Sequence, residues 1–202
     1  MAKRKVKTAR DRQVDAIELL IVDHKAVKKL HKRYEALMED DADAAERGAV
    51  AAEICRALTA HATAEEEIFY PAVRNAIGEP DLMDEADIEH ASAKDLIAQI
   101  ESMQPDESHY DARVIVLCEY IDHHVKEEEK EMFPKAHRAR KKLDLAALGA
   151  KLAARKAELM SVGSGDEDAD TQDEVAPARL RAALTAARRS SAVPARRTAS
   201  RR

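Results

Sequence analysis

Glycine, proline and aromatic residues are scarce in this sequence. Its 202 residues include 5 glycines, 6 prolines and no tryptophan, and aromatic residues make up only 3% of the chain. Alanine, leucine, glutamate, lysine and arginine dominate instead, and 36% of positions are charged. This composition is typical of an all-helical protein. The length suits one domain with a tail, and 45% hydrophobic residues are enough to build its core.

Cysteines and long apolar runs are also few or missing. Cys55 and Cys118 are too few for a disulfide framework, which predicts a reduced protein of the cytoplasm. No run of about 18 apolar residues occurs, so we expect no membrane span. The basic start MAKRKVKTAR is soon followed by acidic residues, which argues against a signal peptide. The net charge of −5 gives no case for nucleic-acid binding by the molecule as a whole.

The charge pattern divides the chain into four segments. Residues 1–12 form a basic arm without apolar periodicity, and residues 13–140 carry four apolar stripes. Residues 141–160 are expected to extend the last helix, and residues 161–202 form an acidic and then arginine-rich tail. Blocks of like charge stay solvated, so we predict that this tail is disordered.

Each of the four stripes has apolar residues at alternating steps of three and four, as on one face of an α-helix. The acidic cluster DDADAAERG separates the first two stripes, and the second is expected to end or kink at Pro71. The third lies between GEPD and Pro105, and the fourth begins near Val114, bends at Pro134 and continues weakly to about Leu159. Because each helix has a single apolar face to bury, we predict an all-α, up-down-up-down four-helix bundle.

Polar residues interrupt the apolar faces near the middle of all four helices. Each helix has a histidine where leucine or isoleucine would be expected, and two of these histidines are followed four residues later by a glutamate. An i,i+4 step places both side chains on one face of a helix. The six candidate metal ligands are His24, His61, Glu65, His90, His124 and Glu128.

Six polar residues on buried faces need a reason, because an unpaired carboxylate in an apolar core costs several kcal/mol. A single zinc ion takes about four ligands and would not use them all. Two metal ions that share four imidazoles and two carboxylates would satisfy every one. Iron, manganese and zinc all accept mixed nitrogen and oxygen ligands, and the pattern does not select among them.

An internal repeat supports this interpretation. A shift of 63 residues lays ICRALTAHATAEEEIFYP over LCEYIDHHVKEEEKEMFP, which matches His61 with His124. A shift of 66 residues lays Asp23 and His24 over Glu89 and His90. Two similar helix pairs predict two equivalent half-sites about a pseudo-twofold axis. The repeat also favours His124 with Glu128 over the neighbouring pair, His123 with Glu127, which has the same spacing.

These motifs resemble the hemerythrin family, in its HHE cation-binding branch. The resemblance spans about residues 14–140 and rests on DHKAVKKLH, HATAEEEIFYP, EHASAKDL and HHVKEEEKEMFP. It implies a non-heme di-iron centre with a bridging oxygen species, in which Glu65 and Glu128 bridge the irons and the histidines fill terminal positions. Oxygen-carrying hemerythrins have a close histidine pair on the third helix and an aspartate at the end of the fourth motif. Here the third helix offers only His90 and position 128 is glutamate, which argues against simple oxygen carriage.

The other histidines are expected to have simpler roles. His31 lies seven residues after His24 on the same stripe, and we expect it in the core or at its rim, with support of the metal site as the alternative. His109, His123 and His137 are expected at the surface or in loops.

Simple packing or solvation is also expected for the residues that follow each glutamate ligand. Glu66 and Glu129 are interpreted as members of solvated faces. The aromatic and methionine residues beyond them are expected to pack at the bundle end, with lining of the site as the alternative. They are Phe69, Tyr70, Met132 and Phe133.

The sequence leaves three functions open. The first is a di-iron protein that binds, senses or decomposes dioxygen, hydrogen peroxide or nitric oxide, with catalase-like chemistry if it is an enzyme. The second is a regulatory metal or redox sensor that acts through its charged tail on a partner, such as nucleic acid, an anionic membrane or an acidic protein. The third is a structural zinc or manganese bundle. The oligomeric state does not follow from the pattern.

Overall fold

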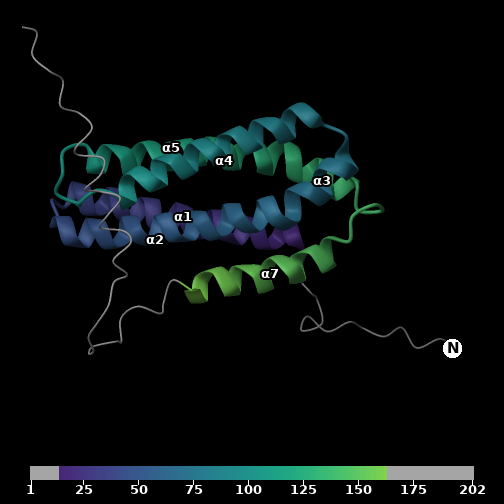
Figure 1. Cartoon of the computed structure of the whole chain (residues 1–202), viewed down its shortest axis with the longest axis horizontal. Coiled ribbons are helices and arrows are strands. Elements are labelled where there is room, and N and C mark those ends of the chain that lie inside the picture. The colour runs from purple at the N-terminus through teal and green to yellow at the C-terminus, as the bar shows by residue number, and fades with distance from the viewer. Residues whose placement is uncertain (1–13, 163–202) are drawn as a thin grey trace, which may run out of the picture. The chain divides into compact units, whose positions relative to one another are not determined.

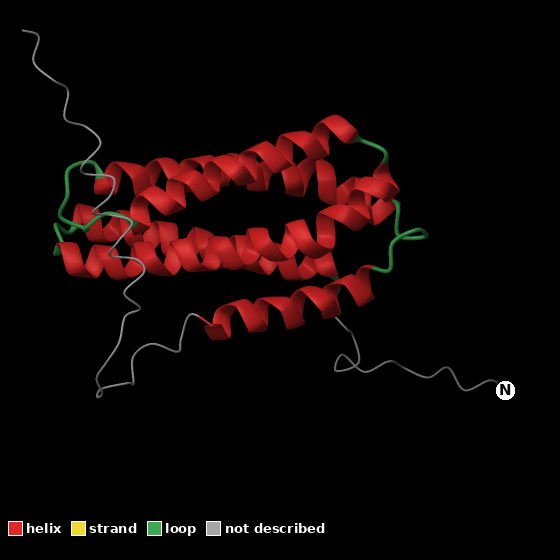
Figure 2. Cartoon of the chain, viewed as in Figure 1, coloured by secondary structure: helices red, strands yellow, loops and turns green. Residues whose placement is uncertain are grey.

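A computed structural model describes residues 14–162 and contains helices without any strand in that range (Figure 2). The arm predicted at residues 1–12 lies outside the described residues. So does the predicted tail, except for Ser161 and Val162, which end the last helix. None of the described helices is long and apolar enough to cross a membrane.

Four long antiparallel helices build the bundle, as predicted. They are α1 (Ala16–Glu39), α2 (Ala44–Ala64), α4 (Pro80–Glu101) and α5 (Tyr110–Glu127). In Figure 1, α1 and α2 lie side by side, and α4 and α5 form a second pair that covers them. The two pairs correspond to the two copies of the sequence repeat.

Short polar signals set the ends of these helices. Asp15 and Glu18 form a reciprocal capping box at the start of α1. Asp43 caps α2 from within the acidic cluster, so this cluster is only partly a break: its second half, from Ala44, is already helical. Gly78, with φ of +70°, ends the second long helical segment in the left-handed conformation that glycine adopts without strain.

The second helix was expected to end or kink at Pro71, and it does not end there, because the chain stays helical through the proline. After α2 the chain forms one π-helical turn, η2 (Glu65–Phe69), and then α3 (Tyr70–Ile77). The N–H of Tyr70 donates to the carbonyl of Glu65, five residues back, and this wider spacing comes just before the proline that lacks a donor. The second repeat does the same with η3 (Glu128–Met132) and α6 (Phe133–Arg138), which contains Pro134.

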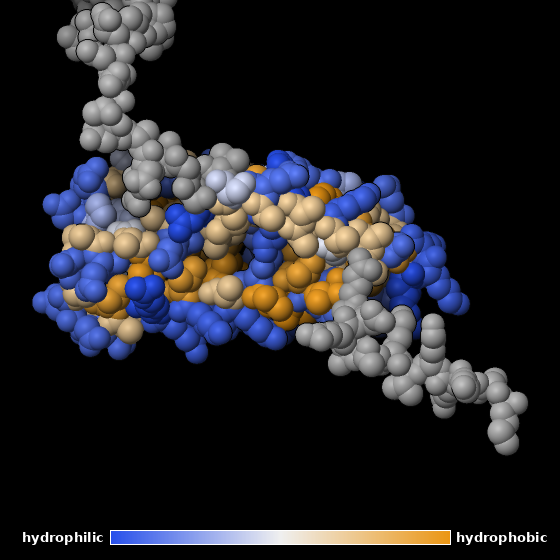
Figure 3. All heavy atoms as spheres, turned by 90° about the horizontal axis from the view of Figure 1, so that it is seen from below, coloured by the Kyte–Doolittle hydropathy of each residue, from blue (hydrophilic) through white to orange (hydrophobic). Residues whose placement is uncertain are grey.

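A separate fifth helix replaces the expected extension of the fourth. α6 ends at Arg138, and α7 (Leu145–Val162) folds back against α1 and α2 (Figure 1). Its Gly149 lies so close to the start of α1 that an added Cβ would stand 2.7 Å from the carbonyl oxygen of Val14. Seen from the side of α7, apolar residues form an interrupted band along the bundle between hydrophilic ones (Figure 3).

Two apolar clusters fill the bundle, one on either side of the central histidines and glutamates. One cluster includes Val27, Leu58, Ile97 and Ile121. The other includes Leu20, Phe69, Ala86 and Phe133, together with Leu145 and Leu152 of α7. The polar residues in the middle are therefore held between two packed layers and shielded from solvent.

The close approach at Gly149 predicts a steep penalty for any side chain there. Gly149→Val should destabilise the protein by about 1–3 kcal/mol, because the new side chain overlaps the backbone of α1. The matched control is Ala150→Val on the exposed face of the same helix, which should cost only about 0.5 kcal/mol through helix propensity. Urea unfolding measures both, and equal losses would show that α7 is not packed at this position.

Candidate metal centre

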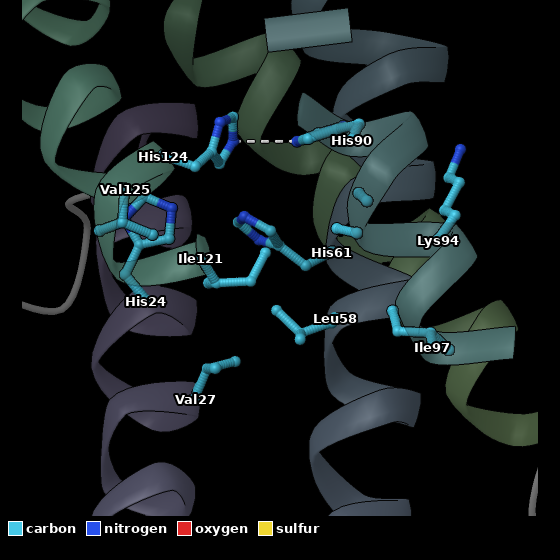
Figure 4. Close-up of a pocket in the computed structure, with 12 residues that line it drawn as sticks. His24, Val27, Leu58, His61, His90, Lys94, Ile97, Ile121, His124 and Val125 are labelled. Carbon is cyan, nitrogen blue, oxygen red and sulfur yellow. Dashed lines mark hydrogen bonds between the residues drawn. The ribbon is translucent and has the colours of Figure 1, made fainter. Parts of the chain in front are cut away.

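The structure brings all six predicted ligand residues together in the centre of the bundle. Each comes from a different turn of α1, α2, η2, α4, α5 or η3, and all are buried, with Glu65 at 0% and Glu128 at 1% exposure. Figure 4 shows the four imidazoles converging from the four helices, with Nε2 of His90 and His124 3.0 Å apart.

Each glutamate lies between one histidine of each helix pair. Oε2 of Glu65 is 3.1 Å from Nε2 of His61 and 3.6 Å from Nε2 of His90. Oε2 of Glu128 is 3.2 Å from Nε2 of His24 and 3.7 Å from Nε2 of His124. Ligands bound to one metal ion at about 2.0–2.2 Å are about 3.0–3.6 Å apart, so these spacings suit shared coordination.

The residues form two adjoining groups that could each hold a metal ion. The first contains His24, His61, Glu65 and Glu128, and the second contains Glu65, His90 and His124. Because Glu65 belongs to both groups, the arrangement suits two ions joined by a carboxylate better than one ion alone.

The outer nitrogen of every central histidine faces a further carboxylate. Nδ1 of His24 lies 2.9 Å from Glu129, and Nδ1 of His90 lies 3.0 Å from Glu66. Nδ1 of His124 lies 2.7 Å from Glu89, and Nδ1 of His61 lies 3.4 Å from Asp23. A carboxylate only accepts hydrogen bonds, so each Nδ1 carries a proton and each Nε2 is left facing the centre.

Glu66 and Glu129 keep solvent access, as their interpretation as solvated faces predicts, but that interpretation missed that each of them also orients a central imidazole. Asp23 and Glu89 were missed altogether. The repeat carried the signal, since the shift of 63 residues matches Glu66 with Glu129 and the shift of 66 matches Asp23 with Glu89.

The expected packing of Tyr70 at the bundle end is wrong, because its hydroxyl points into the centre. It donates to Oε1 of Glu128 at 2.9 Å and lies 3.1 Å from Nε2 of His90. Its counterpart in the repeat is Phe133, whose ring stacks on His24 at 5.7 Å. The two half-sites therefore differ, with a hydroxyl on one side and a ring on the other. Phe69 and Met132 pack in the core as expected.

The remaining histidines lie away from the two central groups. His31 is buried along α1 and lies 3.5 Å from Glu35, while His109 and His137 are exposed. His123 is exposed on α5 and lies between Glu89 and Glu127.

Unpartnered buried atoms show that the central residues fit a bound cation. Among the described residues, six buried side-chain atoms have no hydrogen-bond partner, and five of them belong to the candidate ligands. These five are Nε2 of His24, Nε2 of His61, both carboxylate oxygens of Glu65, and Oε2 of Glu128. A buried polar atom without a partner costs about 1–3 kcal/mol, and metal coordination would remove this cost at each of them.

The electrostatics of the centre also favour a cation. Burial lowers the pKa of His61, but the charge of Glu65, the hydrogen bond with Asp23 and the charge of Glu128 outweigh it and raise this pKa to about 10. Burial would raise the pKa of Glu128, yet the neighbouring histidines hold it below its usual value. The Glu128 carboxylate therefore stays charged and requires positive charge beside it.

A small apolar cavity adjoins the imidazoles. It measures about 20 Å³, and its walls include all four histidines together with Leu58, Ile97 and Ile121 (Figure 4). A cavity needs roughly 10–15 Å³ to hold one water-sized molecule. The space beside the centre therefore suits a molecule of a few atoms and excludes a larger organic substrate.

The match to known proteins agrees with this geometry. The family model described as hemerythrin HHE cation binding domain matches residues 15–136. The chain belongs to this family. As an HHE domain, it has a hemerythrin-like helical fold and binds a metal cation, in agreement with the buried clusters of histidine and glutamate.

Two relatives illustrate the range of the HHE domain. A crystal structure of an HHE cation binding domain-containing protein from Mycobacterium kansasii is 26% identical, with a TM-score of 0.59, and the match covers 74% of this chain and 89% of that one. A DNA nickase from Nostoc sp. strain PCC 7120 is 40% identical over 81 residues, which are 40% of this chain. The matched part is only 23% of the length of that protein.

The raised pKa of His61 predicts that metal binding releases protons. Below pH 10 the metal-free imidazole is protonated, so an incoming cation must displace a proton from Nε2, and affinity should rise about tenfold per pH unit for each proton released. Zn²⁺ titrations of the metal-free protein from pH 6 to 9, in buffers of different ionisation enthalpy, measure both effects.

The stability of the metal-free fold changes with pH in the opposite direction to the metal affinity. Since the folded pKa of His61 lies above the unfolded value of about 6.5, its stabilisation is complete below that pH and is lost as the pH rises toward 10.

His137→Ala is the control for the Zn²⁺ titration and should release the same number of protons as the wild-type protein. An affinity for Zn²⁺ that is flat from pH 6 to 9 would contradict a protonated His61.

Proposed function

We propose that this protein holds two iron ions between its four helices and uses them to bind and react with a small oxidant. The observation that carries the proposal is the pair of buried ligand groups that share Glu65, beside a cavity sized for a few atoms. The six ligands would be the four central histidines with Glu65 and Glu128. Imidazole and carboxylate ligands suit iron, and they also accept manganese or zinc.

The bound metal pair would supply the electrons for reduction or decomposition of dioxygen, peroxide or nitric oxide. The chain itself supplies the walls of the cavity, the orientation of the imidazoles and one hydrogen-bond donor. Asp23, Glu66, Glu89 and Glu129 hold the imidazoles with Nε2 inward, and the apolar walls keep bulk water away from the cavity.

Tyr70 is placed to provide the hydrogen-bond donor. Burial raises the pKa of its hydroxyl well above the usual value, and the charges of Glu65 and Glu128 raise it further, so the group keeps its proton. The hydroxyl lies beside His90 and His124, the two histidines of the second half-site. An oxidant bound at this half-site would accept a hydrogen bond from Tyr70.

We do not extend the activity of the Nostoc DNA nickase to this chain, because the matched segment is less than a quarter of that protein. Both cysteines are free thiols buried in the core, which supports the proposal that the protein works in the cytoplasm.

The first test is metal analysis with an ultraviolet-visible spectrum on protein from cells grown with iron. We expect about two irons per chain and charge-transfer bands that disappear on reduction. Glu65→Gln should lower the content to less than about one, because this residue belongs to both groups. The control is Glu67→Gln, two residues away and exposed in an ion pair with Arg155, which should keep both irons. One zinc per chain, or a bare spectrum in a folded protein without metal, would sink the di-iron proposal.

The position of Tyr70 gives a second test. Tyr70→Phe should retain both irons but decompose hydrogen peroxide about a hundredfold more slowly, since it removes the hydrogen-bond donor. Tyr120→Phe on α5 serves as the control, because the Tyr120 hydroxyl lies outside the centre. An unchanged rate with Tyr70→Phe would mean that the hydroxyl only supports Glu128.

A further inference from the structure

A third cluster of metal-capable residues lies on the surface, next to the buried centre. It consists of Glu89 on α4 and of His123 and Glu127 on α5. One donor atom from each residue lies within 4.8 Å of the other two. The cluster combines an imidazole with two carboxylates from two helices, which is a ligand set that first-row divalent cations accept.

The geometry of His123 suits a ligand more than a hydrogen-bonded side chain. Its Nδ1 is 3.5 Å from Oε1 of Glu89, and its Nε2 is 3.7 Å from Oε1 of Glu127. Both distances exceed those of a good N–H···O hydrogen bond. The side chain of His123 is 64% exposed, so it can turn either nitrogen toward a cation that arrives from solvent.

Uncompensated negative charge surrounds this imidazole. No lysine or arginine within residues 14–162 forms an ion pair with Glu89 or Glu127. The two carboxylates that face His123 therefore leave a local excess of negative charge that a divalent cation would neutralise.

The pseudo-twofold repeat contains an internal comparison for this site. Asp23 corresponds to Glu89, and there the ammonium group of Lys156 from α7 pairs with the carboxylate. Ala60 and Ala64 stand where His123 and Glu127 stand in the second repeat. In the first half-site a lysine thus supplies the positive charge, and in the second half-site two ligand-type side chains take its place.

We propose that Glu89, His123 and Glu127 form an exchangeable site for a divalent cation, which captures metal from solvent before it enters the buried centre. Three protein ligands leave positions for water, so the ion is held weakly and can leave again. Glu89 links the two places, because Oε1 faces His123 while Oε2 lies 2.7 Å from Nδ1 of His124. The cation site stands by itself, whereas its role in capture rests on the proposed function of the buried centre.

The site is tested on the full chain with the buried centre already filled with iron. We expect one further Mn²⁺ per chain, detected as loss of the electron paramagnetic resonance signal of free Mn²⁺. His123→Ala and Glu127→Gln should each weaken this binding at least about tenfold, and His137→Ala, which removes another exposed imidazole, should leave it unchanged. Absence of the further Mn²⁺, or equal binding by His123→Ala, would overturn the site.

The capture role is tested separately by the rate of iron uptake into the metal-free protein. His123→Ala should fill the centre at least about fivefold more slowly but reach the same final iron content, because only the local supply of cation is lost. Equal uptake rates would overturn the capture role. If the wild-type protein fails to hold iron in the buried centre at all, the proposed function fails, while the loss of one bound Mn²⁺ on His123→Ala, a residue outside the buried centre, still decides whether the surface site exists.

Discussion

Two carboxylates with almost no exposure lie in the middle of this bundle, and the arrangement of the other residues depends on their charge. Glu65 and Glu128 cannot be left unpaired in an apolar core, because desolvation of a single charge costs several kcal/mol. Four imidazoles turn Nε2 toward them, and four outer carboxylates fix those imidazoles from behind. The apolar clusters on either side then shut out the water that would otherwise compete for these groups.

The repeat explains both the regularity of the centre and its asymmetry. Each helix pair supplies two histidines, one central glutamate and two outer carboxylates, so the set of candidate ligands is nearly symmetric. The two half-sites differ in the residues around this set. Tyr70 occupies the position that Phe133 has in the other repeat, and Lys156 contacts Asp23 where His123 contacts Glu89 in the other half-site. Two similar half-sites with different neighbours can hold similar ions and still do different work, since only one of them has a hydroxyl that can form a hydrogen bond with a ligand.

Apolar periodicity was sufficient to predict the bundle, and the repeat was sufficient to choose His124 over His123. Both rest on spacing along a helix, which the sequence shows directly. The direction of Tyr70 could not be predicted, because the π-helical turn before Pro71 rotates every later residue relative to an ideal helix. Nor could the return of α7, since its contact with α1 depends on the shape of the surface around Gly149 rather than on any pattern. The outer carboxylates were missed for another reason: a glutamate beside a ligand looks the same in sequence whether it faces solvent or an imidazole.

The ion pair between Lys156 and Asp23 gives the last helix a mechanical connection to the centre. Lys156 contacts Asp23, Asp23 contacts His61, and His61 contacts Glu65, so four side chains join α7 to the shared ligand. Any force or partner that draws α7 away from the bundle would remove a positive charge from Asp23 and change the basicity of the His61 imidazole. By the same linkage, filling the centre would change how firmly α7 is docked. The position of α7 and the state of the buried centre are therefore thermodynamically coupled.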